Sequence, residues 1–471
     1  MQLPIVQPAP IVIEHAGAFR DLFENHCQFD HFQNYLTGLM VLENKSLSNI
    51  SQCVLESADK TNLSRFLSQA PWSEREVNRR RVEYRNQQTQ KHQRGAADSC
   101  LIIDDTVCEH VGTLFEFVDR HDDPSENRYP LAHNLVTRHF VSGAVRFPID
   151  ARIYRRYEEK TQWETFVKKH FPDRSIPKEA KARKRFHQEV DPLLLKDEEF
   201  AKLDAQFQTK IVLAVELIKE AIAGQVAFET VLMDSWFLAP DILELLRQLN
   251  LHWVSLLKKN RNLETHRFIL KDAQGKPMTL KAPHIKVQDL VPLIPKTAFR
   301  KAQIGETAYW YFALHLRIPE MGKVRLVISF NTPDLTGTYA VLVSDRTDWS
   351  AKKIIQTYLQ RWPIETFYQD SQGPLGLDEY RMRTAEAFQK HWGLVFVAYS
   401  FLHLDCLPAS PMKSRSLTHP IHTIGQVCRR QGQLLIQKLI LLAHELLLNG
   451  VAAKEVFAQF FQKQSLGLLT S

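Results

Sequence analysis

Two short apolar runs that end in aspartate decide the fold of this 471-residue chain. SCLIIDDT, residues 99–106, leads into Asp104 and Asp105, and FETVLMDSWF, residues 228–237, leads into Asp234. Short runs rich in β-branched residues with polar boundaries are typical of buried strands. In an α/β domain, acids at the ends of such strands can be directed into one cleft.

Further strands and helices are predicted around these two runs. Three strand-like segments follow the first run: GTLFEFVD (112–119), NLVTRHFVSG (134–143) and VRFPIDARIYRRY (145–157). A helix is predicted over residues 207–224 with Gly224 as its C-terminal stop, and another over residues 240–250 with Pro240 near its first turn. Strand, strand, strand, helix, strand, helix is the order of a ribonuclease-H-like α/β fold.

The rest of the chain predicts an insertion and two helical regions. Residues from about 252 to 344 contain four strand candidates and are interpreted as an all-β insertion. Asp348 or Ser350 is expected to cap the next helix, and Pro363 is expected to kink or interrupt it. GLVFVAYSFLHL (393–404) is expected to be a buried helix. A polar linker, LPASPMKSRSLTHP (407–420), then precedes a helical tail that reaches about residue 461.

These patterns predict three domains. They are a helical DNA-binding domain over residues 1–95, a catalytic domain over residues 96–400 that contains the β-rich insertion, and a C-terminal helical region over residues 401–471. The DNA-binding reading of the first domain rests on several short helices with a basic final one. Three-helix packing without a DNA role is the alternative.

The composition is that of a folded chain without a membrane partner. Apolar residues make up 44% and charged residues 24%, near the averages for globular proteins. The longest apolar stretch, LLIQKLILLAHELLLNG (434–450), is interrupted by four polar residues and is too short to span a membrane. No secretion signal and no Cys-x-x-Cys pair are seen, so a cytoplasmic protein with reduced cysteines is expected.

Basic residues are concentrated in two segments of a chain whose net charge is +7. Between Ala151 and Val190 there are twelve Lys/Arg and six Asp/Glu residues. The second basic segment runs from Arg75 to Arg94 and includes Arg79, Arg80 and Arg81. Such segments can neutralise phosphates of a nucleic-acid backbone, and a solvated helix face is the alternative.

Three acids are candidates for metal-dependent phosphodiester chemistry: Asp104, Asp234 and Glu365. Two Mg²⁺ ions about 3.5–4 Å apart can stabilise both the attacking and the leaving oxygen, and carboxylates are suitable ligands for them. Mn²⁺ could substitute. Each acid also has a structural alternative: a strand-end turn for Asp104 or Asp105, a loop hydrogen bond for Asp234, and an ion pair with Arg361 for Glu365.

Three blocks of the sequence resemble the catalytic blocks of bacterial insertion-sequence transposases of the Asp-Asp-Glu (DDE) class. They are LIIDDT (101–106), VLMDSWF (231–237) and YLQRWPIETFYQDSQGPLGLDEYRMR (358–383). The resemblance is to the branch named 701 of the insertion sequence 4 superfamily, and it extends from about residue 20 to about residue 395. That family has a Tyr-x2-Arg-x3-Glu-x6-Lys signature. Tyr358, Arg361 and Glu365 match it, whereas Gln372 replaces the lysine.

The resemblance implies a role for each of these residues. Asp104, Asp234 and Glu365 would be the first, second and third metal ligands. Asp105 is the alternative to Asp104, which is favoured because the family places its acid two residues before a Thr or Ser, here Thr106. Tyr358 and Arg361 would hold phosphates of the transposon end. Gln372 can hydrogen-bond a phosphate but adds no charge, which weakens the expected grip on DNA.

Further DNA contacts are expected in the insertion. Lys258 and Lys259 lie at its start as candidate phosphate contacts. Trp310, between Tyr309 and Tyr311, would either stack on an extruded base or pack across strands.

The expected function is therefore Mg²⁺-dependent cut-and-paste transposition. A homodimer would act on double-stranded DNA, cutting at terminal inverted repeats and joining the freed ends to target DNA. Two alternatives are a ribonuclease-H-like nuclease that cuts without joining and a non-catalytic DNA-binding protein derived from a transposase.

Overall fold

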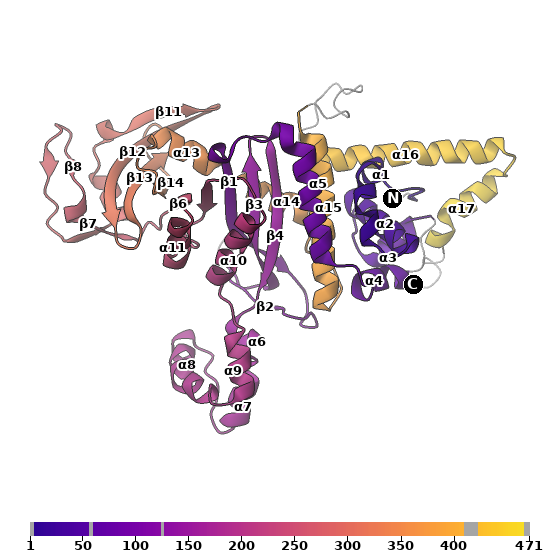
Figure 1. Ribbon diagram of the computed structural model, residues 1–471, viewed down its shortest axis with the longest axis horizontal. Helices are drawn as coiled ribbons and strands as arrows, with labels where there is room; N and C mark the ends of the chain where they lie inside the picture. The colour runs from indigo at the N-terminus through magenta and orange to yellow at the C-terminus, as the bar shows by residue number, and fades with distance from the viewer. Residues whose placement is uncertain (1–3, 56–59, 124–126, 409–422, 466–471) are drawn as a thin grey trace.

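The structure is a computed structural model that describes residues 4–55, 60–123, 127–408 and 423–465. A mixed β-sheet with helices on both faces lies at its centre (Figure 1). A β-rich extension lies on one side of the sheet, the N-terminal helices and a long helical tail lie on the other, and a separate group of helices hangs from one end of the strands. The fold is mixed α/β, as the sequence predicts for a ribonuclease-H-like domain with helical flanks.

The strands expected from the two aspartate-ended runs form the centre of the sheet. The central strands are β1 (Ser99–Glu109), β3 (Leu131–Ser142), β4 (Val145–Tyr154), β5 (Thr230–Met233) and β6 (His252–Leu256). Their spatial order is β4-β3-β1-β5-β6. β1, β5 and β6 are parallel, whereas β3 is antiparallel to both β1 and β4. A two-residue strand, β2 (Asp119–Arg120), pairs with the start of β3.

Apolar side chains alternate between the two faces of the sheet and build a core on each. Leu101 and Ile103 of β1 face α10 (Lys210–Ala223) and α11 (Pro240–Gln248), which supply Leu217, Ile242 and other apolar residues. Cys100 and Ile102 belong to the other core. That core contains residues of α13 (Ala351–Leu359), α14 (Pro363–Gln372) and α15 (Ala385–Cys406). Because side chains alternate along a strand, Asp104 and Asp105 are directed to opposite faces.

The insertion between β6 and α13 extends the same sheet. Its strands are β7 (Asn262–Glu264), β8 (Leu270–Lys271), β9 (Pro277–Met278), β10 (His284–Lys286), β11 (Arg300–Ile304), β12 (Thr307–Ile318), β13 (Gly322–Phe330) and β14 (Tyr339–Ser344). β14 pairs with β6, and the order continues through β13 and β12 to β11. A single-turn helix, α12 (Val287–Leu290), and short 3-10 turns also occur here, so the insertion is β-rich but not entirely β.

The N-terminal helices share one continuous core with α15 and one face of the sheet. They are α1 (Pro10–Ala16), the 3-10 helix η1 (Gly17–Leu22), α2 (His26–Val41), α3 (Leu47–Cys53), α4 (Lys60–Ser68) and α5 (Glu74–Thr89). After α15, the described chain resumes with α16 (Ile424–Leu448) and α17 (Ala453–Ser465). None of the helices in the described ranges has both the length and the apolar character that crossing a membrane requires.

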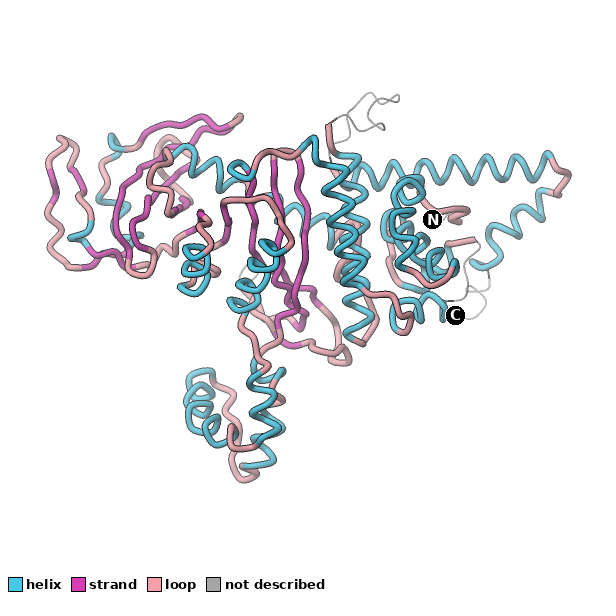
Figure 2. Tube along the Cα trace, viewed as in Figure 1, coloured by secondary structure: helices cyan, strands magenta, loops and turns pink. Residues whose placement is uncertain are grey.

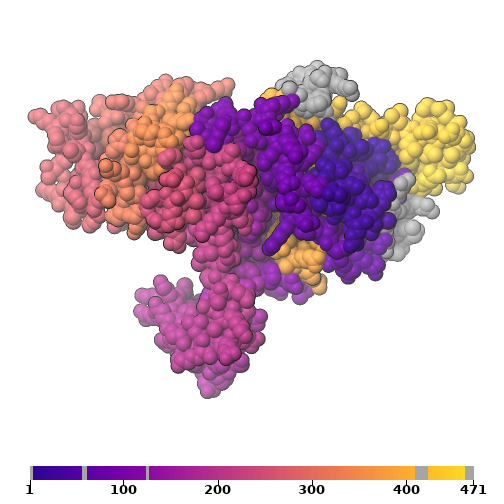
Figure 3. Space-filling model, in the orientation of Figure 1, coloured from indigo at the N-terminus to yellow at the C-terminus, as the bar shows by residue number. Residues whose placement is uncertain are grey.

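A group of four helices between β4 and α10 stands apart from the body of the protein. The helices are α6 (Tyr157–Lys160), α7 (Trp163–His170), α8 (Ala180–Leu194) and α9 (Glu198–Ala205). Figure 2 shows that helices and connecting loops make up this group, and Figure 3 shows it protruding through a narrow neck. It has a core of its own around Trp163, Phe186 and Phe200. Residues 155–206 are called the helical unit below.

Local boundary predictions are confirmed at several points. α10 ends at Ala223 with Gly224 at its C-cap, and α11 begins at Pro240. The Ser350 hydroxyl accepts a hydrogen bond from the Lys353 amide and caps α13, and the helical pattern is interrupted before α14 begins at Pro363.

Two predictions about the strands are wrong. GTLFEFVD forms turns rather than a strand until Asp119, and Phe117 adopts a left-handed φ of 65°. Asp104 lies in the middle of β1 rather than at its end. Most of the linker predicted over residues 407–420 lies outside the described residues.

Candidate active site

The candidate site forms where β1 outruns its parallel neighbour. The last parallel pair between β1 and β5 is Ile103 with Met233. Asp104 is the next residue of β1, and Asp234 directly follows the end of β5. Beyond this point β1 stays paired only with β3. The sheet therefore opens on the β5 side of Asp104, and both acids lie at the mouth of this opening.

The two adjacent aspartates have different partners on opposite faces of the sheet. The Asp104 carboxylate accepts a hydrogen bond from the Arg361 guanidinium, on the face covered by α14. The Asp105 carboxylate accepts hydrogen bonds from Asn134 Nδ2 and Lys210 Nζ, each at 2.8 Å. Lys210 is the first residue of α10, which covers the other face. The alternation of side chains along β1 thus places only Asp104 beside Arg361 and Glu365.

Arg361 bridges two of the three candidate acids. Its Nη1 contacts Asp104 Oδ2, and its Nη2 donates to Glu365 Oε1 at 2.7 Å. The side chains of Arg361 and Asp104 are 14% and 13% exposed, so this ion pair is largely buried. Glu365 lies in the first turn of α14 and is 35% exposed. The ion pair suggested as the structural alternative for Glu365 therefore exists, and it extends to Asp104.

Asp234 is held by the loop that follows β5. Its Oδ1 accepts hydrogen bonds from the backbone amides of Trp236 at 2.9 Å and Phe237 at 3.1 Å. The Ser255 hydroxyl donates to its carbonyl oxygen at 2.9 Å. The two amide hydrogen bonds fix the carboxylate, and both are made to the same one of its two oxygens.

The acids influence one another electrostatically. Burial raises the pKa of Asp104 to about 7, the Arg361 guanidinium opposes this rise, and the neighbouring acids Asp234, Asp105 and Glu365 add to it. Burial also raises the pKa of Asp234, against the two amide hydrogen bonds that lower it. Carboxylates gathered in one partly buried place favour a bound cation, which would offset their repulsion.

The donor set fits a hard divalent cation, although Arg361 occupies the place between two of its members. Asp104, Asp234 and Glu365 offer carboxylate oxygens, which Mg²⁺ and similar ions prefer. Within the described ranges, no three His, Cys, Asp or Glu side chains are arranged closely enough to hold a metal ion. Asp104 and Glu365 each contact Arg361, so the guanidinium must withdraw before both can face the same ion.

The other signature residues surround this site. The Arg361 guanidinium lies 5.9 Å from the centroid of the Tyr358 ring. Gln372 Nε2 donates to the carbonyl of Val107 at 2.9 Å and so ties the end of α14 to β1. Gln372 therefore has a structural contact in place of the charge that a lysine would supply.

Lys258 and Lys259 line a cleft of about 500 Å³ that reaches the loop after β5. Ser235, the residue after Asp234, belongs to its lining, together with Tyr309 and Tyr339 from the insertion. The Lys259 ammonium lies 4.2 Å from the centroid of the Tyr339 ring.

Trp310 does not belong to the lining of this cleft. Its ring lies 5.6 Å from the Lys301 ammonium, on the neighbouring strand β11. The aromatic side chains that the insertion contributes to the cleft lining are Tyr309, Tyr339 and the buried Phe330.

The three consecutive arginines of α5 have different environments. Arg79 is exposed and pairs with Glu83, while Arg80 makes two hydrogen bonds of 2.7 Å to the Asp21 carboxylate. Arg81 is 1% exposed, and its guanidinium donates to the carbonyl oxygens of residues 148 and 149 and to the Ser400 hydroxyl. Arg81 therefore has no face toward solvent that could contact DNA, contrary to its prediction as a phosphate contact.

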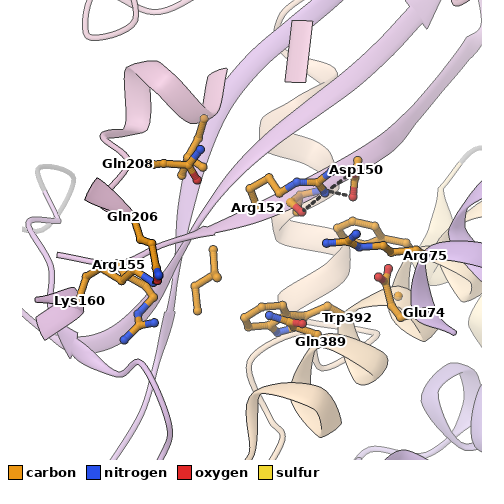
Figure 4. Close-up of a pocket in the computed structure, with 15 residues that line it drawn as sticks. Glu74, Arg75, Asp150, Arg152, Arg155, Lys160, Gln206, Gln208, Gln389 and Trp392 are labelled. Atoms are coloured by element: carbon orange, nitrogen blue, oxygen red, sulfur yellow. Dashed lines mark hydrogen bonds and ion pairs between the residues drawn. The ribbon is translucent and has the colours of Figure 1, made fainter. Parts of the chain in front are cut away.

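A second polar cleft, of about 280 Å³, lies between α5, α15 and the neck of the helical unit. Figure 4 shows Glu74 and Arg75 on one side of it and Arg155, Lys160 and Gln206 on the other. Burial raises the pKa of Glu74 to about 7. None of the three candidate acids lines this cleft, so it is separate from the carboxylate site.

Sequence reasoning missed the residues that support the acids from elsewhere in the chain. Lys210 and Asn134 hold Asp105, and the Tyr368 hydroxyl lies 2.5 Å from Thr137 Oγ1, next to the Asp104 strand. Lys210 stands at a recognisable helix start after Thr209, but only the tertiary fold brings it to Asp105.

A sheet of this order, with acids gathered where its central parallel strands diverge, defines a ribonuclease-H-like enzyme. Two family models match the chain: one described as DDE superfamily endonuclease, over residues 18–286, and one described as Transposase DDE domain, over residues 208–401. The first covers more than half of the chain, which therefore belongs to the DDE superfamily endonucleases. The protein is thus a DDE endonuclease or transposase, a class that uses divalent metal ions and acts on DNA. Comparison with curated proteins finds no match.

Proposed function

We propose that the protein is a cut-and-paste transposase of the insertion sequence 4 superfamily, branch 701, with Asp104, Asp234 and Glu365 as its catalytic acids. The observation that carries this proposal is the convergence of Asp104 and Glu365 on Arg361, beside Asp234. Asp104 and Arg361, which are 257 positions apart in the sequence, are joined there by an ion pair. The spacing of Tyr358, Arg361 and Glu365 also follows the signature of that family.

The three acids would hold two Mg²⁺ ions, for which Mn²⁺ could substitute. When bound, such ions activate water and stabilise the charge on the attacking and leaving oxygens. Asp234 is already oriented by its amide hydrogen bonds. Arg361 would exchange its two carboxylate partners for a phosphate of the transposon end, a ligand that suits its bidentate geometry.

The same residues would serve both steps of transposition. Water cleaves a phosphodiester bond at the element's end and leaves a 3′-hydroxyl group, and this hydroxyl then attacks a phosphodiester bond of the target DNA. Both are in-line transfers at phosphorus, so one site can support them. We further propose that a homodimer holds two terminal inverted repeats during these steps.

DNA would approach the acids along the cleft beside Asp234. Lys258 and Lys259 would contact its phosphates, and Tyr358 and Gln372 would contact the transposon end. Trp310 is a candidate for stacking on an extruded base, and Tyr309 and Tyr339, which line the cleft, are further candidates. Arg79 and Arg80 on α5 remain candidates for contacts by a DNA-binding domain over residues 1–95.

Cleavage and joining assays with the purified chain test this function. The substrate is duplex DNA that carries the element's end, with a target plasmid and Mg²⁺. We expect nicking and strand-transfer products from the wild type. Asp104→Asn should lower both by about three orders of magnitude and leave DNA binding intact.

The adjacent variant Asp105→Asn provides the matched control. It removes one charge one residue away but on the opposite face, so activity should fall by less than about tenfold. Equal losses in the two variants would contradict the assignment of Asp104. Cleavage without joining would identify a nuclease, and binding without cleavage by the wild type would identify a DNA-binding protein.

A further inference from the structure

Four cations on the helical unit are exposed and form no ion pair with any described residue: Lys178, Lys181, Lys184 and Arg185. We call them the basic face. Lys181, Lys184 and Arg185 are three and four positions apart, so they share one side of α8. The buried residues Phe186 and Val190 direct the other side of the helix to the core. Like charges at this spacing repel each other, and an anionic partner would relieve that repulsion.

Other cations of the helical unit are neutralised internally. Arg183 pairs with Glu158 and Glu164, and Arg174 pairs with Glu189 at 2.6 Å. The unit therefore contains acids that pair with nearby cations, yet none of them pairs with the basic face. Elsewhere on the unit, Lys196 and Lys202 are exposed in a segment that contains Asp197, Glu198 and Glu199. The charge of the unit is thus asymmetric.

The neck of the helical unit lies at the same edge of the sheet as the candidate acids. β4 is parallel to β1, because both are antiparallel to β3, so the two strands end at one edge. Asn134 of β3 pairs with Val107 on one side and with Tyr154, the last residue of β4, on the other. The helical unit begins directly after Tyr154.

The chain that leaves the unit comes even closer to the acids, at Lys210. Lys210 begins α10 and binds Asp105 at 2.8 Å. Its ammonium also lies 5.3 Å from the ring centroids of both Tyr154 and Trp236, the second residue after Asp234. Figures 1 and 3 show the unit projecting away from this edge. DNA that enters the carboxylate site and continues past that edge would run alongside the unit.

The helical unit has the internal contacts of a rigid arm. Trp163, Phe186 and Phe200 form its core, and the Trp163 indole donates to Asp191 Oδ1 at 2.7 Å. The core-facing side of α8 is fixed by these contacts, so the basic face is presented in one orientation.

The chemistry of the basic face suits a phosphate backbone. It contains three lysines and one arginine and no aromatic side chain, so it offers positive charges but no aromatic ring on which bases could stack. Contacts of this kind position a duplex without reading its sequence.

We propose that the basic face binds the phosphate backbone of duplex DNA that extends from the carboxylate site. This inference rests on the proposed function, since it assumes that DNA occupies that site. The helical unit would then form a second contact with the DNA, at the end of the strands from which it projects.

Fluorescence anisotropy with a linear duplex of arbitrary sequence tests the proposal. The full-length variant Lys181→Gln/Lys184→Gln removes two charges of the basic face, and Lys196→Gln/Lys202→Gln removes two exposed charges elsewhere on the same unit. Between roughly 50 and 200 mM salt, each lost phosphate contact should reduce the slope of log affinity against log salt by about 0.9. We expect a loss of about 1.8 in slope and at least about fivefold in affinity for the first variant, and less than about twofold for the second.

Circular dichroism should show unchanged folding, because all four lysines are exposed. Equal affinity and equal slope for the wild type and the Lys181/Lys184 variant would overturn the proposal and leave the proposed function standing. Equal losses in both variants would also overturn it, since the effect would then follow net charge alone. A change in oligomeric mass without a change in DNA binding would assign the face to contacts between copies of the chain. If the wild type fails to bind duplex DNA, both this proposal and the proposed function are contradicted.

Discussion

Replacing Arg361 with glutamine tests whether this residue is the cation that holds the carboxylate site together. The Arg361 guanidinium contacts Asp104 and Glu365, and the Arg361 and Asp104 side chains are 14% and 13% exposed. Arg361→Gln removes the charge that lowers the pKa of Asp104. The contributions that raise this pKa, burial and the neighbouring acids, remain.

The expected loss of stability depends on pH in a defined direction. With Arg361 in place the pKa of Asp104 is about 7, compared with an ordinary value of 3.8. In the variant this pKa rises further. Between pH 7 and the new pKa, the folded variant keeps a proton that the unfolded chain has released. Its free energy of unfolding therefore falls by about 1.4 kcal/mol per pH unit, whereas Asp104 of the wild type contributes no slope there.

Thermal unfolding at pH 5 and pH 8 without divalent ions measures this effect. At pH 5 Asp104 is protonated in both folded proteins, so the variant should differ only by the lost contacts of Arg361. At pH 8 its deficit should grow by about 1.4 kcal/mol, or roughly 3–6 °C for a cooperative unit of 150–250 residues. Mg²⁺ should stabilise the variant more than the wild type, because no guanidinium competes for the acids.

Two controls make the result specific. Lys353→Gln removes a cation of α13 whose ion pair with Asp98 is exposed, and its effect should not depend on pH in this way. In the double variant Asp104→Asn/Arg361→Gln, residue 104 no longer titrates, so the extra loss at pH 8 should disappear. A deficit of Arg361→Gln that is equal at pH 5 and pH 8 would refute the reasoning.

Three other changes have defined outcomes. Gln372→Lys should restore the signature charge and steepen the salt dependence of end binding by about 0.9, and an unchanged slope in a binding titration would argue against a phosphate contact there. Trp163→Ala should cost about 3–5 kcal/mol within the separate core of the helical unit. Limited proteolysis should then cut residues 155–206 first, and a uniform loss of resistance along the chain would contradict local unfolding. Burial raises the pKa of Glu74 from 4.5 to about 7, so the wild type holds a buried charge at pH 8 that Glu74→Gln removes. At pH 8 the free energy of unfolding of that variant should exceed that of the wild type by about 1–3 kcal/mol, with no gain from this cause below pH 4.5. Urea midpoints that shift equally at both pH values would contradict this prediction.

The sequence by itself determined the elements whose cause is local. The apolar runs at residues 99–106 and 228–237 became the two central parallel strands. Gly224 ended a helix, Ser350 capped one, and Pro363 interrupted another, as their backbone and hydrogen-bonding properties predict. Rules of this kind act within a few residues and need no knowledge of the rest of the fold.

Predictions failed where a partner element decided the outcome. GTLFEFVD has strand-like residues, but only Asp119 at its end pairs with β3. Strand propensity expresses fit to a half-buried pleated surface and cannot supply the neighbouring strand. The sequence indicates this region only as a basic stretch, because Trp163, Phe186 and Phe200 lie on three different helices and meet only in the tertiary fold.

The tertiary structure also decided how the candidate site is arranged. The sequence supplied Asp104 and Asp105 as adjacent alternatives, and the two faces of β1 separated them: Asp104 toward Arg361, Asp105 toward Lys210. Arg81, a surface candidate in the sequence, is buried against β4 and α15. A residue's type fixes the bonds it can make, whereas its partners come from distant parts of the chain and depend on how the sheet and helices pack. The chemistry available to the site could therefore be predicted from the sequence, and the arrangement of its charges could not.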